Sequence, residues 1–541
     1  MKALSVLYGG RIASCKAPGA KMASDVKTPD SFFSLALDAA GRFPGVEKTV
    51  FFGIEGMEPF QSPENGFDVV LRPFWTRKSL LEELSAVSAG YDLTYFAWAD
   101  CPLLDPALAA SLADRHTRYA AEYSYADGWP YGFAPELLSP GTAGILAKIL
   151  GDDDGPVERD TLFYVIQKDI NAFDIETEIS PVDLRPYRLT LAADSKRNTL
   201  LLTRFMEAAR PFEPEGRLKA AEAEKIITEK SELLRTLPAF FNIQVTGACP
   251  QACSLCPWPV YGRKDGPINA EVTDTARQDF MPVVAFVSLL DKIAEFAGDA
   301  VISLSLWGEP ALHPDRIALI EAVLSRPALS LIIETSGIGW KKDELEALSL
   351  AASKAAPRKN HMAPLSWVVS LDAHDSLRYK EVRGPGFAEA RDCAKTLLSL
   401  FPKDAYVQAV RVKDSEDDIE HFYRSWKEEG RKDGSHIIIQ KYDDFAGSLP
   451  KKQAADLSPV KRRPCWHIQR DMNILLDGTV PCCREDLGVL KGKGDKEIWG
   501  NAITEDLGII WERGAALYNE HCKAEYRGIC SGCDEYYTYN F

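Results

Sequence analysis

Short apolar runs alternate with amphipathic stretches over the first 205 residues of the chain. The apolar runs have the length and composition of buried strands, and the amphipathic stretches repeat their apolar residues at helical spacing. An α/β domain with a mostly parallel sheet is therefore predicted for residues 1–205. The predicted strands are residues 2–10, 48–54, 91–99 and 187–192, and the predicted helices are residues 31–43 and 105–122.

Residues 2–10 are predicted to be a buried first strand rather than an export signal. Gly9, Gly10 and Arg11 interrupt the apolar run before it reaches the length of a signal peptide. No stretch approaches 18 uninterrupted apolar residues, so no transmembrane helix is predicted. These features predict a cytoplasmic protein with no membrane insertion.

From residue 239 to about residue 447, six strand-like runs alternate with helical stretches. Short β-branched runs joined by amphipathic helices indicate parallel strands with right-handed crossovers. Six such units predict a partial (βα)6 TIM-like barrel, whose ligands gather at the carboxyl ends of the strands. The predicted strands are residues 240–247, 301–308, 329–337, 365–373, 405–412 and 436–442.

Two further segments complete the predicted organisation of the chain. Residues 206–238 are charged and alanine-rich, which predicts a connecting helix. Residues 448–541 are rich in turns and cysteine, which predicts a small domain held together by metal. The 541 residues carry a net charge of −16, so a broad nucleic-acid surface is not expected.

Nine of the twelve cysteines fall into two clusters, and no export signal is predicted, which favours metal ligands over disulfides. The first cluster, Cys249, Cys253 and Cys256, has the spacing C-x3-C-x2-C and directly follows the first strand of the six-unit domain. Three thiolates suit a [4Fe–4S] cluster with one iron left open to a small molecule. The alternatives are a loop with free cysteines or a zinc site that takes a distant fourth ligand.

The second cluster lies near the C-terminus. The turn at Asp477-Gly478 predicts a hairpin of residues 472–476 and 479–483, which would bring Cys465 and Cys483 together. Four thiolates would close a second [4Fe–4S] cluster without an open site, and a four-cysteine zinc ribbon is the alternative. The favoured ligands are Cys465, Cys483, Cys530 and Cys533, with adjacent Cys482 as the runner-up to Cys483 and Cys522 as a further candidate.

The cysteine triplet after the first strand of a six-fold βα domain resembles the radical S-adenosylmethionine (radical SAM) superfamily. In that family, the amino and carboxylate groups of S-adenosylmethionine chelate the open iron. An electron from the cluster then cleaves the sulfonium and gives a 5′-deoxyadenosyl radical, which abstracts hydrogen from the substrate. The resemblance also implies an electron donor such as flavodoxin or ferredoxin.

Further motifs of the same family match at the next strand ends. WGEP, residues 307–310, resembles the family's GGEP motif with Trp307 in place of the first glycine, and ETSG (334–337) and SLDA (370–373) follow in order. The residues that the resemblance assigns to S-adenosylmethionine are Leu255 beside the adenine, Gly308 and Glu309 at the methionine amino group, and Ser336, Ser370 and Asp372 at the ribose or the methionine end.

The C-terminal segments DGTVPCC, GNAITEDLGIIW and CSGCD resemble, in the same order, the SPASM extension of radical SAM enzymes in its shortened form. The resemblance implies one auxiliary [4Fe–4S] cluster held by the four favoured cysteines. SPASM relatives modify peptides or proteins, and others act on carbohydrate-like small molecules. The implied substrate is a peptide, a protein, or an envelope carbohydrate or lipid precursor, and the spacing assigns no catalytic acid or base.

DCPL, residues 100–103, resembles the sugar-nucleotide cytidylyltransferases, whose acid at this position binds a metal, so the resemblance implies Mg²⁺ at Asp100. Residues 183–195 resemble a later strand of that family, without its second acidic pair, and only GGRIA remains of its longer glycine-rich loop. Nucleotidyl transfer and a retained scaffold that binds a substrate or partner both stay open for this domain.

For the whole chain, the alternative to a radical SAM enzyme is a nucleotide-binding or nucleotidyltransferase protein with structural zinc or iron–sulfur. The three-part order is similar to that of radical SAM/SPASM proteins of spirochaetes.

Overall fold

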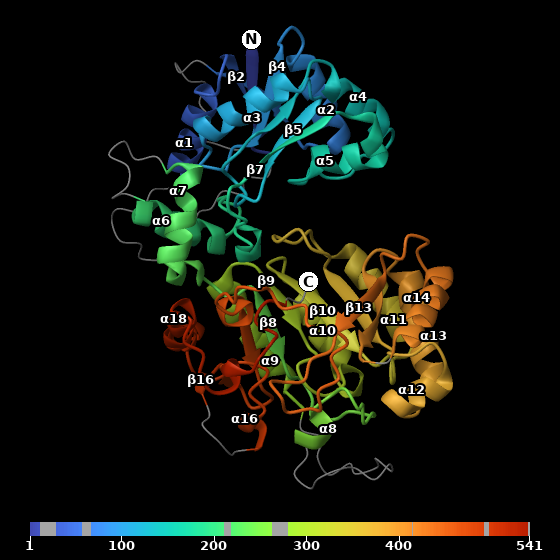
Figure 1. Cartoon of the computed structure of the whole chain (residues 1–541). Coiled ribbons are helices and arrows are strands. Elements are labelled where there is room, and N and C mark those ends of the chain that lie inside the picture. Colours follow the sequence, from blue (N-terminus) through green and yellow to red (C-terminus); the bar gives the residue numbers. More distant parts are fainter. Residues whose placement is uncertain are drawn as a thin grey trace. The chain divides into compact units, whose positions relative to one another are not determined.

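The computed structural model describes residues 1–10, 29–56, 67–209, 218–261, 280–413, 415–491 and 497–538. The chain forms two compact units, Met1–Leu234 and Arg235–Phe541 (Figure 1). The finer division of the chain into four parts stays a prediction. Within the described segments, no helix has both the length and the apolar character needed to cross a membrane.

The first unit is built on a seven-stranded sheet in the order β3-β2-β1-β4-β6-β5-β7. Strand β6 is antiparallel to β4 and β5, and all other neighbours pair in parallel, so the prediction of a mostly parallel sheet is confirmed. The loop predicted after β1 lies outside the described residues from residue 11 onward. The strands are β1 (Ala3–Tyr8), β2 (Val46–Ile54), β3 (Asp68–Arg72), β4 (Leu93–Trp98), β5 (Tyr123–Asp127), β6 (Glu136–Leu138) and β7 (Ile175–Ile179).

Helix α3 of this unit begins where the sequence predicts. The side chain of Asp105 accepts a hydrogen bond from the backbone N–H of Ala107 (2.8 Å), and Pro106 stands in the first turn. The second carboxylate oxygen of Asp105 accepts from the N–H of Ala220 at the start of α7 (2.8 Å). The helices are α1 (Pro29–Gly41), α2 (Arg77–Val87), α3 (Pro106–Arg118), α4 (Thr142–Leu150), α5 (Thr161–Ile166), α6 (Lys196–Ala209) and α7 (Ala220–Glu229).

The strand predicted at residues 187–192 is wrong. The segment begins at the end of a 3₁₀ turn, η2 (Arg185–Tyr187), and Arg188 takes a left-handed φ of +52°. Its apolar residues Leu189 and Leu191 pack in the core that includes α6 and α7. Thr190 forms an isolated parallel bridge with Tyr131, and the segment does not join the sheet as a strand. The alternating apolar residues, which resembled a strand, therefore belong to a loop that buries one of its sides.

The second unit contains the predicted six-fold repeat, and the expected fold is confirmed. Its sheet has the order β13-β12-β11-β10-β9-β8-β14, and every neighbouring pair is parallel. Sequential parallel strands joined by helices put all their carboxyl ends on one edge. The strands are β8 (Phe240–Ile243), β9 (Ala300–Ser303), β10 (Leu329–Thr335), β11 (Leu365–Ser370), β12 (Ala405–Arg411), β13 (Ile437–Lys441) and β14 (Asp471–Ile474).

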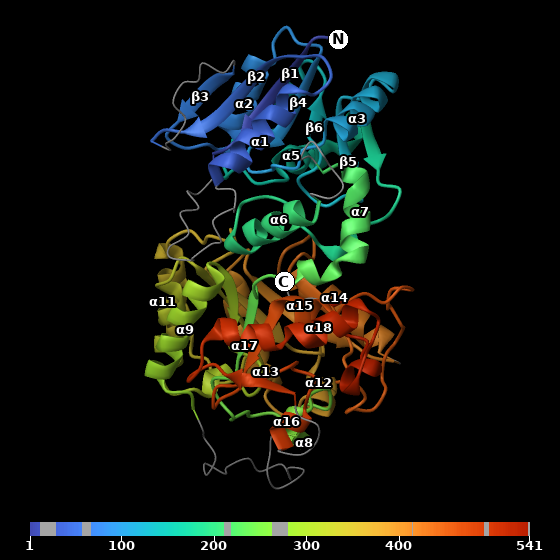
Figure 2. The same ribbon diagram turned by 90° about the vertical axis from the view of Figure 1, so that its left-hand side faces the viewer.

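The connecting helices of this unit bury one apolar stripe each. In α9, the buried residues Phe286, Leu289, Leu290 and Ile293 recur at helical spacing and join the core of the sheet. Helix α9 contacts α10, α10 contacts α11, and α11 contacts α13. Helices α17 and α18 also lie side by side (Figure 2). The helices are α8 (Trp258–Tyr261), α9 (Val283–Ala297), α10 (Arg316–Leu324), α11 (Lys342–Lys354), α12 (Ser376–Val382), α13 (Phe387–Leu400), α14 (Glu416–Glu429), α15 (Trp466–Arg470), α16 (Gly488–Lys491), α17 (Leu507–Arg513) and α18 (Ala515–Cys522).

The hairpin predicted around Asp477-Gly478 is wrong in its pairing. Strand β14 joins the large sheet in parallel beside β8, and β15 (Thr479–Pro481) pairs antiparallel with β16 (Ile498–Asn501). A turn does form at Gly478, which has φ of +86°. All four residues of β14 are buried, so the strand gains more from the open edge of the apolar sheet than from a two-stranded hairpin.

Candidate functional site

The loop with the first three cysteines follows β8 and is held on two sides by backbone hydrogen bonds. The N–H of Glu309, after β9, donates to the carbonyl of Ala248 (2.7 Å). The N–H of Ser254 donates to the carbonyl of Val382 at the end of α12 (2.8 Å). The loop is therefore fixed to the second and the fourth strand–helix units, at the edge where the carboxyl ends of the strands lie.

Cys249, Cys253 and Cys256 are half-buried, and they lie close enough for their charges to interact. Burial raises the pKa of all three, to about 12 for Cys249. The pKa of Cys256 is raised further by the negative charges of Cys253 and Cys249. Neighbouring thiolates repel one another, and a bound cation offsets this repulsion. This donor set therefore fits a [4Fe–4S] cluster with an open iron.

Gly308 and Glu309 follow β9, as the WGEP motif predicts. Gly308 has φ of +84°, and a Cβ there would lie 2.2 Å from the carbonyl oxygen of Thr246, so the backbone fit requires glycine. The buried carboxylate of Glu309 accepts hydrogen bonds from the hydroxyl of Thr335 (2.6 Å) and the N–H of Ser336 (2.7 Å). Glu309 thus joins the ends of β9 and β10, and its role at a methionine amino group stays a prediction.

Asp372 follows β11 and takes a left-handed φ of +58°. One carboxylate oxygen accepts from the N–H of Val410 (2.7 Å), and the other is paired with the guanidinium of Arg383. Arg383 also donates through Nε to the side chain of Gln251 in the cysteine loop (3.2 Å), and its positive charge opposes the rise in the pKa of Cys253. Arg383 lies outside the SLDA motif, and no pattern in the sequence singled it out.

The remaining predicted contacts also lie at the strand ends. The hydroxyl of Ser370 donates to Glu334 (2.9 Å), and the side-chain amide of Gln408 donates to the same carboxylate oxygen (3.0 Å). Ser336 is buried, and Leu255 is half-buried on the cysteine loop. Glu334 is the first residue of the ETSG motif, whereas Gln408 lies in the middle of a predicted strand and could not be singled out.

Trp307, which replaces the first glycine of the GGEP motif, is part of an aromatic wall. Its ring stacks on Trp258 with centroids 6.0 Å apart and lies 5.8 Å from the ring of Phe445. Cys249 and Cys256 pack against the same buried cluster. Trp307, which replaces the glycine of the motif, therefore makes apolar contacts that cover part of the cysteine loop.

The second set of cysteines is brought together by α15, β15 and η6 (Gly528–Ser531). Burial raises the pKa of all four thiols, to about 12 for Cys465. The charge of Glu485 raises the pKa of Cys483 further, as do those of Cys465, Cys482 and Cys533, and the charge of Cys530 raises the pKa of Cys465. Two buried and two half-buried cysteines whose charges interact fit a closed [4Fe–4S] cluster, and they fit a structural zinc equally well.

Cys482 interacts with the same set, because the charge of Cys530 raises its pKa, after the larger effects of burial, Asp486 and Glu497. Burial raises the pKa of Cys482, and the charge of Asp486 raises it next. The Cys482 sulfur lies 4.0 Å from a carboxylate oxygen of Asp486. Cys522, the last residue of α18, is half-buried and packs against the core. The choice of Cys483 as the favoured ligand, with Cys482 as the runner-up, stays a prediction.

Buried charges lie beside the second set of cysteines. Arg484 donates to Glu485 (3.0 Å) and to Asp443 after β13 (3.2 Å). The ammonium of Lys441 is paired with Glu535. Burial raises the pKa of Glu485 and Asp443, and the charge of Asp443 raises the pKa of Glu485 further. Nearby carboxylates further disfavour thiolates, so a metal bound here has more negative charge to compensate.

Within the described residues, no group of three or more histidine, cysteine, aspartate or glutamate side chains stands in a geometry that could hold a metal ion. The fit of the two cysteine sets therefore rests on the type of donor, its burial and the mutual effect of the thiols. The ligand assignments stay predictions.

Asp100 lies at the carboxyl end of β4, as predicted, but its surroundings do not fit a bound Mg²⁺. Both carboxylate oxygens are bound by the guanidinium of Arg159, at 2.6 and 3.2 Å. The same guanidinium lies 2.8 Å from a carboxylate oxygen of Asp194. Asp194 lies within residues 183–195, the segment judged to lack a second acidic pair, so that judgement missed one acid that the fold brings to Asp100.

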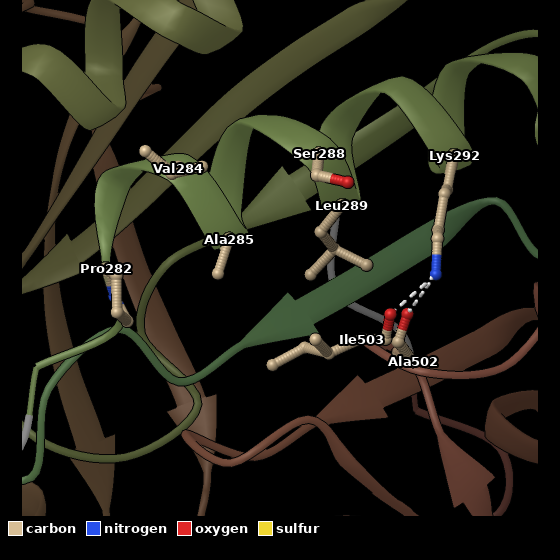
Figure 3. Close-up of a pocket in the computed structure, with 8 residues that line it drawn as sticks. All are labelled: Pro282, Val284, Ala285, Ser288, Leu289, Lys292, Ala502 and Ile503. Carbon is tan, nitrogen blue, oxygen red and sulfur yellow. Dashed lines mark hydrogen bonds between the residues drawn. The ribbon is translucent and has the colours of Figure 1, made fainter.

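A surface pocket of about 350 Å³ lies between the first half of α9 and the segment around residue 503 (Figure 3). The ammonium of Lys292 donates to the carbonyls of Ala502 (3.0 Å) and Ile503 (2.8 Å) and closes one end. Apolar side chains such as Val284 and Leu289 line the rest. None of the lining residues belongs to the predicted site.

Comparison with known proteins finds relatives without an assigned function. No family model matches the chain. An uncharacterized protein of Treponema pallidum (strain Nichols) is 36% identical over 387 residues, which are 70% of this chain and 98% of that protein. A second uncharacterized protein of the same strain is 43% identical over 54 residues, 10% of this chain and 25% of its own length.

Solved structures resemble parts of the chain at low identity. SuiB of Streptococcus suis bound to precursor peptide SuiA is 17% identical, covers 58% of this chain and 74% of its own, and has a TM-score of 0.39. BtrN in complex with AdoMet and 2-DOIA is 15% identical and covers 55% and 94%, with a TM-score of 0.35. A cytidylyltransferase of Leptospira borgpetersenii is 13% identical and covers 43% and 95%, with a TM-score of 0.33. Because these scores are low, functional assignment rests on the chain's own residues.

Proposed function

We propose that this chain, which belongs to the family of the uncharacterized Treponema pallidum protein, is a radical SAM enzyme with one auxiliary iron–sulfur cluster. One observation carries the proposal: three half-buried cysteines follow the first strand of the second unit's parallel sheet, and charges within this set raise the pKa of Cys249 and Cys256 after burial. The motifs at the ends of β9, β10 and β11 follow in the order expected from the sequence.

A [4Fe–4S] cluster on Cys249, Cys253 and Cys256 would supply one-electron reductive chemistry to S-adenosylmethionine. The chain's own part is to hold the loop and to exclude water. Backbone bonds at Ala248 and Ser254 fix the loop at both ends. The ring of Trp307 shields the sulfurs from solvent, which strengthens the electrostatic interactions inside the site.

Arg383 has the clearest positioning role in this proposal. It links Asp372, which the resemblance assigns to S-adenosylmethionine, to Gln251 in the cysteine loop. The guanidinium is nearly buried and places a positive charge beside Cys253. Arg383 thus fixes the loop against the end of β11 and stabilises negative charge on the ligands.

For the auxiliary cluster we propose Cys465, Cys483, Cys530 and Cys533 as ligands. A closed shell of four thiolates leaves no open iron, so this cluster would transfer electrons or support the fold rather than bind S-adenosylmethionine. The proposed substrate is a peptide, a protein, or an envelope carbohydrate or lipid precursor. Flavodoxin or ferredoxin is the proposed electron donor.

The test is an assay for 5′-deoxyadenosine. The full chain is reconstituted anaerobically with iron and sulfide, reduced with dithionite and given S-adenosylmethionine. We expect product above the reductant-only background from the wild type and from the control Cys101→Ala, which removes a buried cysteine of the first unit. We expect none from a variant with alanine at 249, 253 and 256. Background-level product from the wild type, or full product from the triple variant, would refute the proposal.

Iron content separates the two cysteine sets. The triple variant should lose roughly half of the bound iron, because one of two [4Fe–4S] clusters is removed. Cys483→Ala should lose the other half, whereas Cys482→Ala should keep it. Zinc in place of iron after loading in the presence of both metals would show that the C-terminal set is a zinc site.

A further inference from the structure

The first unit contains a cation site that the chain fills with its own side chain. Arg159, in the loop before α5, binds both oxygens of Asp100 through its two terminal nitrogens, at 3.2 and 2.6 Å. One of these nitrogens also lies 2.8 Å from an oxygen of Asp194, just before α6. Two acids that lie 94 positions apart in the chain are thus joined by one guanidinium.

The faces of this guanidinium are covered as well as its edges. Its central carbon lies 4.6 Å from the ring centroid of Trp98, the last residue of β4, and 4.9 Å from that of Tyr131. Only a quarter of the Arg159 side chain is exposed, and Asp100 is almost fully buried. Carboxylates at the edges and aromatic rings on the faces hold the guanidinium in one geometry.

We propose that Arg159 takes the place of a divalent cation between Asp100 and Asp194, so that the first unit binds no divalent metal there and performs no metal-dependent nucleotidyl transfer. The charges support this assignment. Two carboxylates and one guanidinium leave a net charge of −1, whereas a divalent cation would leave none. The phosphates of a nucleotide would meet negative charge here instead of a bridging metal.

Removing the guanidinium should therefore create the metal site. Arg159→Met keeps an apolar side chain beside Trp98 and leaves two buried carboxylates without a cation. Mn²⁺ binding to the full chain is followed by the loss of the free Mn²⁺ signal in electron paramagnetic resonance. We expect Arg159→Met to bind one Mn²⁺ more than the wild type, and we expect Asp194→Asn in the same background to abolish the gain.

Arg185 offers a matched control in the same unit. It also bridges two aspartates, Asp127 and Asp183, but its side chain is mostly exposed. Arg185→Met should gain no Mn²⁺ site, because hydrated surface carboxylates are free to separate. A gain equal to that of Arg159→Met would mean that burial at Asp100 is irrelevant and would overturn the proposal.

Two other results also decide against it. One is a Mn²⁺ bound to the wild type that Asp100→Asn removes, because the site would then already take a metal. The other is a folded Arg159→Met chain with no added Mn²⁺ binding.

If Arg159→Met unfolds the first unit, millimolar Mn²⁺ should restore the far-ultraviolet circular dichroism, since the metal replaces the missing cation. Unfolding that Mn²⁺ does not reverse would overturn the proposal.

Discussion

Replacing Gly308 by alanine should loosen the cysteine loop without removing any polar group. The new Cβ would lie 2.2 Å from the carbonyl oxygen of Thr246 and 3.1 Å from that of Ala248, at a φ of +84°. The left-handed backbone costs about 1–2 kcal/mol for any L-residue with a side chain. The close contact adds about 1–3 kcal/mol, because a backbone rather than a flexible side chain has to shift.

Gly447 separates the two contributions. It lies in the same unit with a nearly equal φ of +82°, and a Cβ there would meet no atom within 4 Å. Gly447→Ala should therefore cost only the backbone strain, about 1–2 kcal/mol, whereas Gly308→Ala should cost about 2–5 kcal/mol in total. Because Thr246 lies three residues before Cys249, the shift should also lower the iron bound by the first cysteine set.

Hydrogen exchange measured by mass spectrometry gives the opening free energies of β8 and β9 directly. Exchange of these strands should be faster in Gly308→Ala than in Gly447→Ala, and iron per chain should fall only in Gly308→Ala. Equal exchange and equal iron content in the two variants would refute the steric reasoning. Such a result would mean that the loop adapts to the added carbon at no cost.

Two further predictions concern buried charges. Arg383→Met should lower the stability of the second unit by about 3–5 kcal/mol, because Asp372 is left buried without its cation. Arg383→Lys should restore part of the loss. Thermal unfolding measures both variants, and equal melting temperatures of Arg383→Met and the wild type would contradict the prediction. Burial raises the pKa of Glu136 from 4.5 to about 7, so the folded first unit binds this proton more tightly than the unfolded chain does. The stabilisation is complete below pH 4.5 and is lost as the pH rises through 7. Urea unfolding should therefore show that the unfolding free energy of the wild type falls by roughly 3 kcal/mol relative to that of Glu136→Gln over this range. Parallel pH profiles of the two proteins would contradict the prediction.

The sequence was most informative about the strands of the second unit and the motifs at their ends. Buried parallel strands are short apolar runs between helices, so their position is visible in the pattern of residues. The cysteine triplet and Glu309 could be placed because they directly follow such strands. All six predicted strands and the parallel order are present.

Contacts between distant segments could not be predicted in the same way. Arg383 reaches Gln251 across 132 positions, and only the end of α12 decides that it points to the cysteine loop. Residues 187–192 alternate like a strand, yet Leu189 and Leu191 are buried by helices instead. Residues 472–476 are followed by a good turn, but the free edge of β8 competes for β14. In each case a local pattern was compatible with two tertiary partners.

Buried negative charge is compensated in different ways in the two units. In the first unit, Arg159 supplies one positive charge to Asp100 and Asp194, so their negative charge is compensated in part from within the chain. In the second unit, burial raises the pKa of Cys249 and Cys465 to about 12, so both are protonated at neutral pH. A metal bound there has to displace protons and replace them with its own charge, which makes its binding weaker as the pH falls. Under the proposed function, removal of iron should therefore destabilise residues 235–541 and leave the stability of residues 1–234 unchanged.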